Sequence, residues 1–170
     1  MTTALPIPIE FELPTGWSAV SPEDVGATPL AYVALHDRTH GRFRANITIA
    51  GALRADSQTR PARPAGPAEL EELGEAVFAR LAQGAGVTMV QRRAISSHGA
   101  PGLAQVVQVS TSIEDGPIDL TQGQAYLHLT DPQEPGRQMM VEIVLTCLAE
   151  DSGQLVPQFE EFVASVRPTR

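Results

Sequence analysis

The chain has 170 residues, of which 42% are apolar, and it carries a formal net charge of −8 with a single cysteine. This length is that of one domain, with enough apolar residues for a core of its own. The lone Cys147 excludes an intrachain disulfide and a cysteine-based zinc site, and the acidic charge argues against non-specific nucleic-acid binding, which needs a basic surface.

Three strands are predicted before any helix. Apolar and polar residues alternate over Ile7–Leu13, which indicates a strand with one buried face that must join a covered sheet. Leu30–Leu35 is a short apolar run, and Ala45–Leu53 alternates again after a polar turn that contains Gly41. Short turns between successive strands are typical of an antiparallel meander, because parallel pairs need long crossovers.

A proline-rich polar segment, Arg54–Gly66, separates these strands from the first predicted helix and indicates a surface loop. Pro67 suits the first helical position, and acidic residues follow it near the positive end of the helix dipole. The apolar residues then recur three and four positions apart, as expected for one buried stripe: Leu70, Leu73, Val77, Phe78 and Leu81. Gly84 and Gly86 predict a left-handed helix stop.

Four further strands and a second helix complete the prediction. The last strand is the most apolar, so we expect it at the sheet centre, buried on both faces. The second helix should hold Pro157 in its first turn, because a proline deeper in a helix removes a hydrogen bond. Together the patterns predict a single α+β domain over residues 1–170, with a central antiparallel sheet of about six or seven strands flanked by two helices. The four strands and the helix are Val87–Ile95, Leu103–Ile113, Gln124–Thr130, Gln138–Ala149 and Leu155–Val166.

No pattern in the chain points to a catalytic centre. His36-Asp37-x-x-His40 is the nearest approach to a metal site, but it falls between two strands and lacks a visible third ligand. We therefore predict a solvated turn there, with a small metal-dependent enzyme as the alternative. Ser96-Ser97-His98 lacks the G-x-S-x-G elbow of a nucleophilic serine, and phosphate-binding glycine loops are absent from the sequence. We expect no enzyme, no cofactor and no metal.

A few polar or reactive residues lie on the predicted strands. Glu10 and Glu12 are interpreted as protection of a sheet edge. Glu142 lies inside the most apolar strand, where it would need a partner such as an arginine. Cys147 lies in the same run and is interpreted as a small buried hydrophobe rather than a reactive thiol.

The segments IPIEFELPTGW and FRANITIAGAL, the helix over Leu70–Leu81 and the closing FEEFVASV resemble the PsbP-like superfamily. The similarity extends in particular to LpqN-type proteins of high-GC bacteria and to small chaperones of secreted bacterial effectors. It implies a PsbP-like α/β/α sandwich and a binding role, since such proteins act as accessory subunits, nuclear-import cofactors or effector chaperones. LpqN-type relatives are often lipoproteins, but this sequence shows neither their lipid-attachment cysteine nor a signal segment. We therefore expect a cytoplasmic protein without membrane insertion.

These observations lead to one functional hypothesis, a chaperone- or adaptor-like module that binds another protein, such as a secretion substrate or a component of a larger assembly. Its surface would consist of apolar and aromatic residues that the helices leave uncovered, together with an arginine-bearing loop that could clamp an acidic partner. A solvated linker is the alternative for that loop, and homodimerisation through an edge strand is a further alternative for the protein. The candidate residues are Tyr32, Arg54, Arg60, Arg63, Tyr126 and His128.

Overall fold

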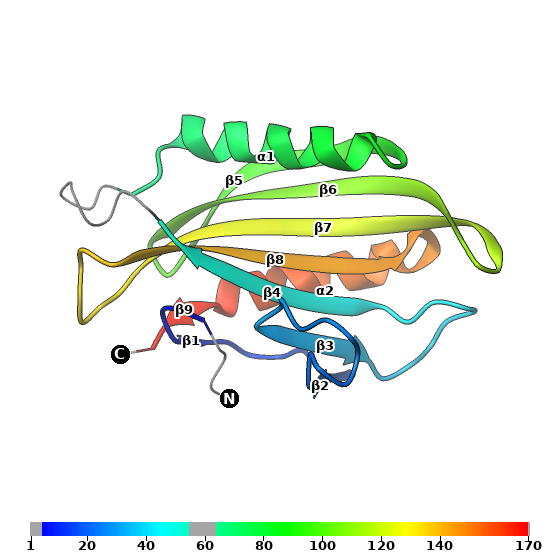
Figure 1. Cartoon of the computed structure of the whole chain (residues 1–170), viewed down its shortest axis with the longest axis horizontal. Coiled ribbons are helices and arrows are strands. Elements are labelled where there is room, and N and C mark those ends of the chain that lie inside the picture. Colours follow the sequence, from blue (N-terminus) through cyan, green and yellow to red (C-terminus); the bar gives the residue numbers. More distant parts are fainter. Residues whose placement is uncertain (1–4, 55–63, 170) are drawn as a thin grey trace.

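The computed structural model describes residues 5–54 and 64–169. Seven antiparallel strands form one sheet in the order β2-β3-β4-β8-β7-β6-β5, and a separate two-stranded ladder pairs β1 with β9 (Figure 1). With the helices α1, Pro67–Ala82, and α2, Ser152–Ser165, this confirms the predicted α+β class. The strands are β1 Ile9–Glu10, β2 Trp17–Val20, β3 Tyr32–His36, β4 Asn46–Leu53, β5 Gly86–Ser97, β6 Ala100–Ile113, β7 Gly116–Thr130, β8 Gln138–Leu148 and β9 Arg167–Pro168.

Strand β8 occupies the centre of the sheet, as predicted, between β4 and β7. Its odd-numbered residues, Met139 to Cys147, are fully buried. Burial raises the pKa of the Cys147 thiol to about 12, which agrees with a packed side chain rather than a reactive one. The prediction that β8 is buried on both faces is wrong, because its even-numbered residues from Met140 to Thr146 are half-exposed.

The N-terminal segment corrects another prediction. Ile7 and Ile9 are buried as their alternation indicated, but only Ile9 and Glu10 pair with another strand, β9, and the segment does not join the main sheet. The sheet edge is formed instead by β2, which the sequence pattern did not reveal. The segment acts as an apolar cover, and the Phe11 ring packs edge-on against Tyr32.

Helix α2, Ser152–Ser165, covers the same face of the sheet, which we call the α2 face. A 3-10 turn, Ala149–Asp151, leads into it, so the helix begins earlier than predicted and Pro157 lies in its second turn rather than its first. The exposed position of Pro157 allows the helix to tolerate the missing hydrogen bond. Phe159 lies directly over Gly123 of β7, where a Cβ atom would come within 2.9 Å of the ring.

Helix α1, Pro67–Ala82, packs on the opposite face, which we call the α1 face, above β5 and β6 (Figure 1). Pro67 begins the helix as predicted. Gly74 allows close approach, because a Cβ atom there would lie 2.5 Å from the Leu103 side chain. The predicted left-handed stop is wrong, since neither Gly84 nor Gly86 has a positive φ. Neither α1 nor α2 has the length and apolarity that a membrane-spanning helix requires.

The contact between Phe159 and Gly123 should be sensitive to a single methyl group. We expect Gly123→Ala to lower the free energy of unfolding by roughly 1–3 kcal/mol, because the added methyl overpacks the helix–sheet interface. Gly153→Ala in α2 is the control, since a Cβ atom there would meet no other atom and alanine favours a helix. Urea denaturation of the two variants tests this, and equal stabilities would contradict it.

Candidate functional site

The central strands expose a band of side chains on the α1 face, because α1 lies over β5 and β6 and not over the middle of the sheet (Figure 1). This band is half-exposed although its strands lie at the core of the fold. We call it the open surface. It consists of Asn46, Thr48 and Ala50 of β4, Glu142, Val144 and Thr146 of β8, and Gln122 of β7.

A chain of side-chain hydrogen bonds connects the open surface to the region beneath α1. The Gln105 side chain accepts from Arg92 Nε at 2.9 Å and donates to Gln124 Oε1 at 2.6 Å. Gln124 donates in turn to Gln122 Oε1 at 3.0 Å, and Gln122 donates to Thr146 Oγ1 at 3.5 Å. Four neighbouring strands, β5 to β8, therefore share one polar network, which we call the glutamine ladder.

The ladder is anchored at its buried end by charge. Arg92 forms ion pairs with Glu71 and Glu75 of α1, and Gln105 donates to the carbonyl oxygen of Gly74 at 3.4 Å. A buried amide is costly unless its donor and acceptor atoms are both engaged, and here they are. Sequence reasoning did not identify this network. The one sign of it in the sequence is that Gln122 and Gln124 are two positions apart, which places both side chains on the same face of a strand.

Three of the predicted binding residues do not offer an exposed surface. Tyr32 is 5% exposed, Tyr126 is 2% exposed and His128 is 1% exposed, so the expectation that the helices leave them uncovered is wrong. Tyr32 lies on the α2 face, under the N-terminal segment. Tyr126 donates to Glu142 at 3.5 Å, where an arginine was the predicted partner of that carboxylate. Burial, followed by the Glu142 charge, raises the pKa of Tyr126.

His128 holds the chain that enters α1. Its Nδ1 accepts a hydrogen bond from the Ala65 backbone N–H at 2.7 Å, so the neutral ring carries its proton on Nε2. Burial, followed by the charge of Arg54, lowers the pKa of His128. Arg54 forms an ion pair with Glu69 at 3.2 Å. Arg60 and Arg63 lie outside the described residues, so the arginine-bearing loop stays a prediction.

The motif His36-Asp37-x-x-His40 lines a polar pocket of about 740 Å³ at the start of α2. Each side chain has another partner: the His36 ring packs against Trp17, Asp37 accepts from Ser18, and His40 lies 2.7 Å from Asp151. That bond raises the pKa of His40. Within residues 5–54 and 64–169, no group of three or more such side chains is arranged to hold a metal ion.

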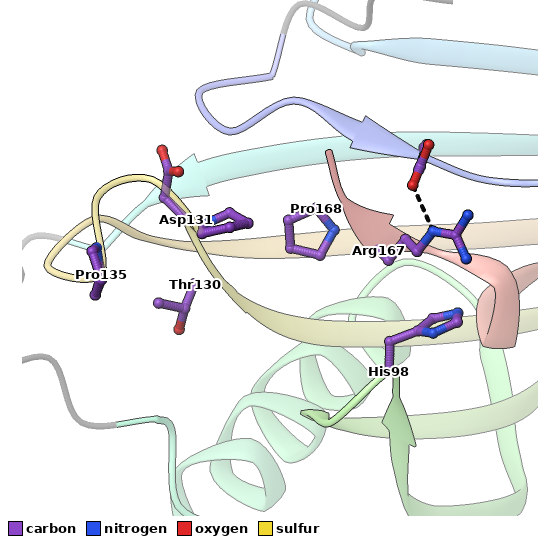
Figure 2. Close-up of a pocket in the computed structure, with 8 residues that line it drawn as sticks. His98, Thr130, Asp131, Pro135, Arg167 and Pro168 are labelled. Carbon is purple, nitrogen blue, oxygen red and sulfur yellow. Dashed lines mark hydrogen bonds and ion pairs between the residues drawn. The ribbon is translucent and has the colours of Figure 1, made fainter. Parts of the chain in front are cut away.

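A second pocket, of about 790 Å³, lies where β1 and β9 meet the β5–β6 turn and the β7–β8 loop (Figure 2). Arg167 donates to Glu10 at 2.6 Å on one wall, and His98 lies opposite the loop that carries Asp131. Asp131 accepts hydrogen bonds from the backbone of its own loop. The side chains of Glu10, Arg167 and Asp131 are thus bonded within the protein, and the interpretation of Glu10 as edge protection stays a prediction.

In the segment Ser96-Ser97-His98, the two serines end strand β5 and His98 begins the tight turn to β6. Ser97 donates its hydroxyl hydrogen toward the carbonyl oxygens of Ala164 and Val166, which ties β5 to the end of α2. His98 has a φ of 48° and precedes Gly99, which also has a positive φ, as a tight hairpin requires. The ring is exposed, and no oriented base–nucleophile pair results.

The same overall fold occurs in proteins of very different sequence. LpqN of Mycobacterium tuberculosis, involved in cell envelope biogenesis, aligns over 99% of this chain and 90% of its own, with a TM-score of 0.67 and 11% identity. CyanoP, the PsbP of Synechocystis sp. PCC 6803, aligns over 95% of this chain and 86% of its own, with a TM-score of 0.59 and 14% identity. PA94 of Pseudomonas aeruginosa, of unknown function, aligns over 81% and 82%, with a TM-score of 0.52 and 15% identity.

No protein-family model and no curated protein sequence matches the chain. At identities of 11–15%, the likenesses establish a PsbP-like fold, as the sequence resemblance implied, and they do not assign partners.

Replacing Gln124, the central residue of the glutamine ladder, should lower the free energy of unfolding. Gln124→Leu would leave a Gln105 donor and a Gln122 acceptor without their partner, so we expect a loss of roughly 1–3 kcal/mol in the free energy of unfolding. Gln108→Leu on the exposed side of β6 is the matched control and should change stability by less than about 0.5 kcal/mol. Urea denaturation measures both, and a stable Gln124→Leu variant would show that the ladder is dispensable.

His128 predicts a loss of stability in mild acid. Its pKa in the folded state lies below the ordinary value of 6.5, so the unfolded chain binds more protons as the pH falls through and below 6.5. Protonation also removes the acceptor for the Ala65 N–H. We expect the free energy of unfolding to fall more between about pH 7.5 and pH 5.5 in the wild type than in His128→Gln, whose amide oxygen can accept without titrating.

His40 acts in the opposite direction, because its raised pKa contributes stability that is present below 6.5 and is lost as the pH rises. The free energy of unfolding is therefore measured for His40→Gln and for the double variant His40→Gln, His128→Gln, so that only His128 differs between the two proteins. Parallel pH profiles for the two proteins would show that His128 does not titrate with unfolding.

Proposed function

We propose that this PsbP-like protein is a non-enzymatic accessory module that binds another protein through its open surface. The observation that carries the proposal is the unequal cover of the sheet. The α2 face is packed by α2 and the N-terminal segment, whereas α1 leaves the middle of the other face half-exposed. An antiparallel sheet commonly packs one face on the core and leaves polar side chains on the other, and that second face is then available to a partner.

The open surface is more polar than the surface of apolar and aromatic residues that the sequence predicts. Within the described residues, the exposed large hydrophobic side chains are Val25, Leu53 and Val90, and they do not form the open surface. The open surface has amide, hydroxyl and carboxylate groups around Ala50 and Val144. Such a surface suits a partner that supplies complementary hydrogen bonds around a small apolar contact. The glutamine ladder fixes the orientation of Gln122, so part of the surface is preorganised.

The partner proposed here is a protein from a larger assembly or a secretion substrate, as for the accessory and chaperone proteins that the sequence resembles. LpqN, which shares the fold, is itself involved in cell envelope biogenesis. The metal-dependent alternative has less support, because His36, Asp37 and His40 are each engaged with a different neighbour.

Site-specific photo-cross-linking in the native host tests the proposal. A photoreactive residue at Thr48 or Thr146 should form one defined cross-linked species, because both side chains lie on the open surface. The same residue at Asp119 of β7, which is exposed away from this surface, is the control and should not form it. Loss of the species on Val144→Arg, with unchanged thermal stability, is the expected confirmation. Equal cross-linking from all three positions, or from none, would contradict the proposal.

A further inference from the structure

The outer side of β5 is a free strand edge. β5 is the last strand of the sheet and pairs with β6, and no other strand among the described residues adjoins it. A bulge between Met89 and Gln91 interrupts the register, and Gln91–Ser97 then pairs regularly with β6 and contains no proline. Such an edge presents unpaired N–H and C=O groups to an additional strand. The opposite edge, β2, is much shorter at four residues.

A small apolar pocket of about 300 Å³ opens beside this edge on the α2 face. Ala104 and Ala125 lie opposite each other on β6 and β7, and their small side chains leave the hollow. Ile95 of β5 and the α2 residues Phe159 and Val163 complete the apolar lining. The volume is at the small end for ligand pockets and suits one large side chain.

The charges that flank the edge are unbalanced. On the α1 face, Arg92 is shared between Glu71 and Glu75, whose side chains are 54% and 65% exposed. One guanidinium between two carboxylates leaves negative charge in excess. On the α2 face, Arg93 and Glu160 form a single pair at 2.8 Å and balance each other. A second copy of the chain would bring the same excess, and a net charge of −8, against itself, whereas a basic strand would be attracted.

We propose that the Gln91–Ser97 edge binds an extended segment of another protein with the local pattern basic–apolar–basic. Alternate residues of a strand point to opposite faces of a sheet. An apolar residue that enters the pocket on the α2 face therefore has neighbours that point to the α1 face, toward Glu71 and Glu75. Main-chain hydrogen bonds to β5 provide affinity, and the pocket with its flanking carboxylates provides specificity. The edge lies apart from the open surface, so this inference stands independently of the function proposed above.

The test uses a synthetic seven-residue peptide with a central Arg-Phe-Arg flanked by valine and threonine. Added to the isotope-labelled protein at low ionic strength, it should shift the backbone amide NMR signals of Gln91–Ser97 in a saturable manner. A peptide with Glu-Phe-Glu at its centre should bind at least about tenfold more weakly, because it opposes Glu71 and Glu75. Thr48→Arg, on the open surface, should leave the binding unchanged.

Two variants close the pocket and keep the test decisive. Ala164→Leu adds a side chain at an exposed α2 position that lines the pocket, where leucine should be tolerated, and Ala104→Leu fills the pocket from β6. Each variant should lower the affinity for the Arg-Phe-Arg peptide by about tenfold or more, which is typical of the loss of one buried aromatic contact. Equal binding by the two peptides, unchanged binding by folded Ala164→Leu, or shifts confined to residues outside β5 would overturn the proposal. Self-association that broadens the β5 signals in the peptide-free protein would assign the edge to a second copy instead.

Discussion

The structure depends on how two helices share a sheet that is wider than either of them. Seven strands create two broad faces, and α2 with the N-terminal segment is needed to cover one face. The close contact between Phe159 and Gly123 brings α2 near the sheet. The side chains that β8 presents to the α2 face are fully buried there, and all of them are apolar. The remaining helix, α1, then covers β5 and β6 and leaves the middle of its face partly exposed. The open surface is thus a geometric consequence of the fold.

Partial cover creates a second problem, because the α1 face changes from buried to solvated within a few strands. The glutamine ladder spans this boundary. Its buried members, Gln105 and Gln124, satisfy each other beneath the edge of α1, and Gln122 carries the hydrogen bonds out to Thr146. A polar group in such a position is stable because its neighbours complete its hydrogen bonds. The ladder therefore joins helix packing and surface chemistry in one network.

Acidic side chains of both helices lie around β5. Arg92 and Arg93 both turn to carboxylates on the flanking helices, one toward α1 and the other toward α2. These pairs hold the edge strand to both layers of the sandwich without covering its outer backbone. The open surface and the β5 edge are consequently two separate surfaces, one a sheet face rich in hydrogen-bonding groups and the other an unpaired strand beside an apolar pocket.

The sequence by itself determined the class of the fold, because periods of two and of three to four residues report directly on strands and helices. It placed β8 at the centre and began α1 at Pro67, and its resemblance pointed to the PsbP-like architecture. It does not distinguish an alternating segment that joins the main sheet from one that mainly buries its side chains, so it predicts Ile7–Leu13 in the main sheet and gives no sign of β2.

Tertiary structure alone decided which side chains are exposed. Tyr126 and His128 follow the alternation that the sequence predicted, yet they are buried, because exposure depends on where α1 and the chain leading into it lie over the sheet. The same reason applies to the glutamine ladder and the β5 pocket. Their members come from separate strands and helices, and only strand register and helix placement bring them within hydrogen-bonding or van der Waals distance.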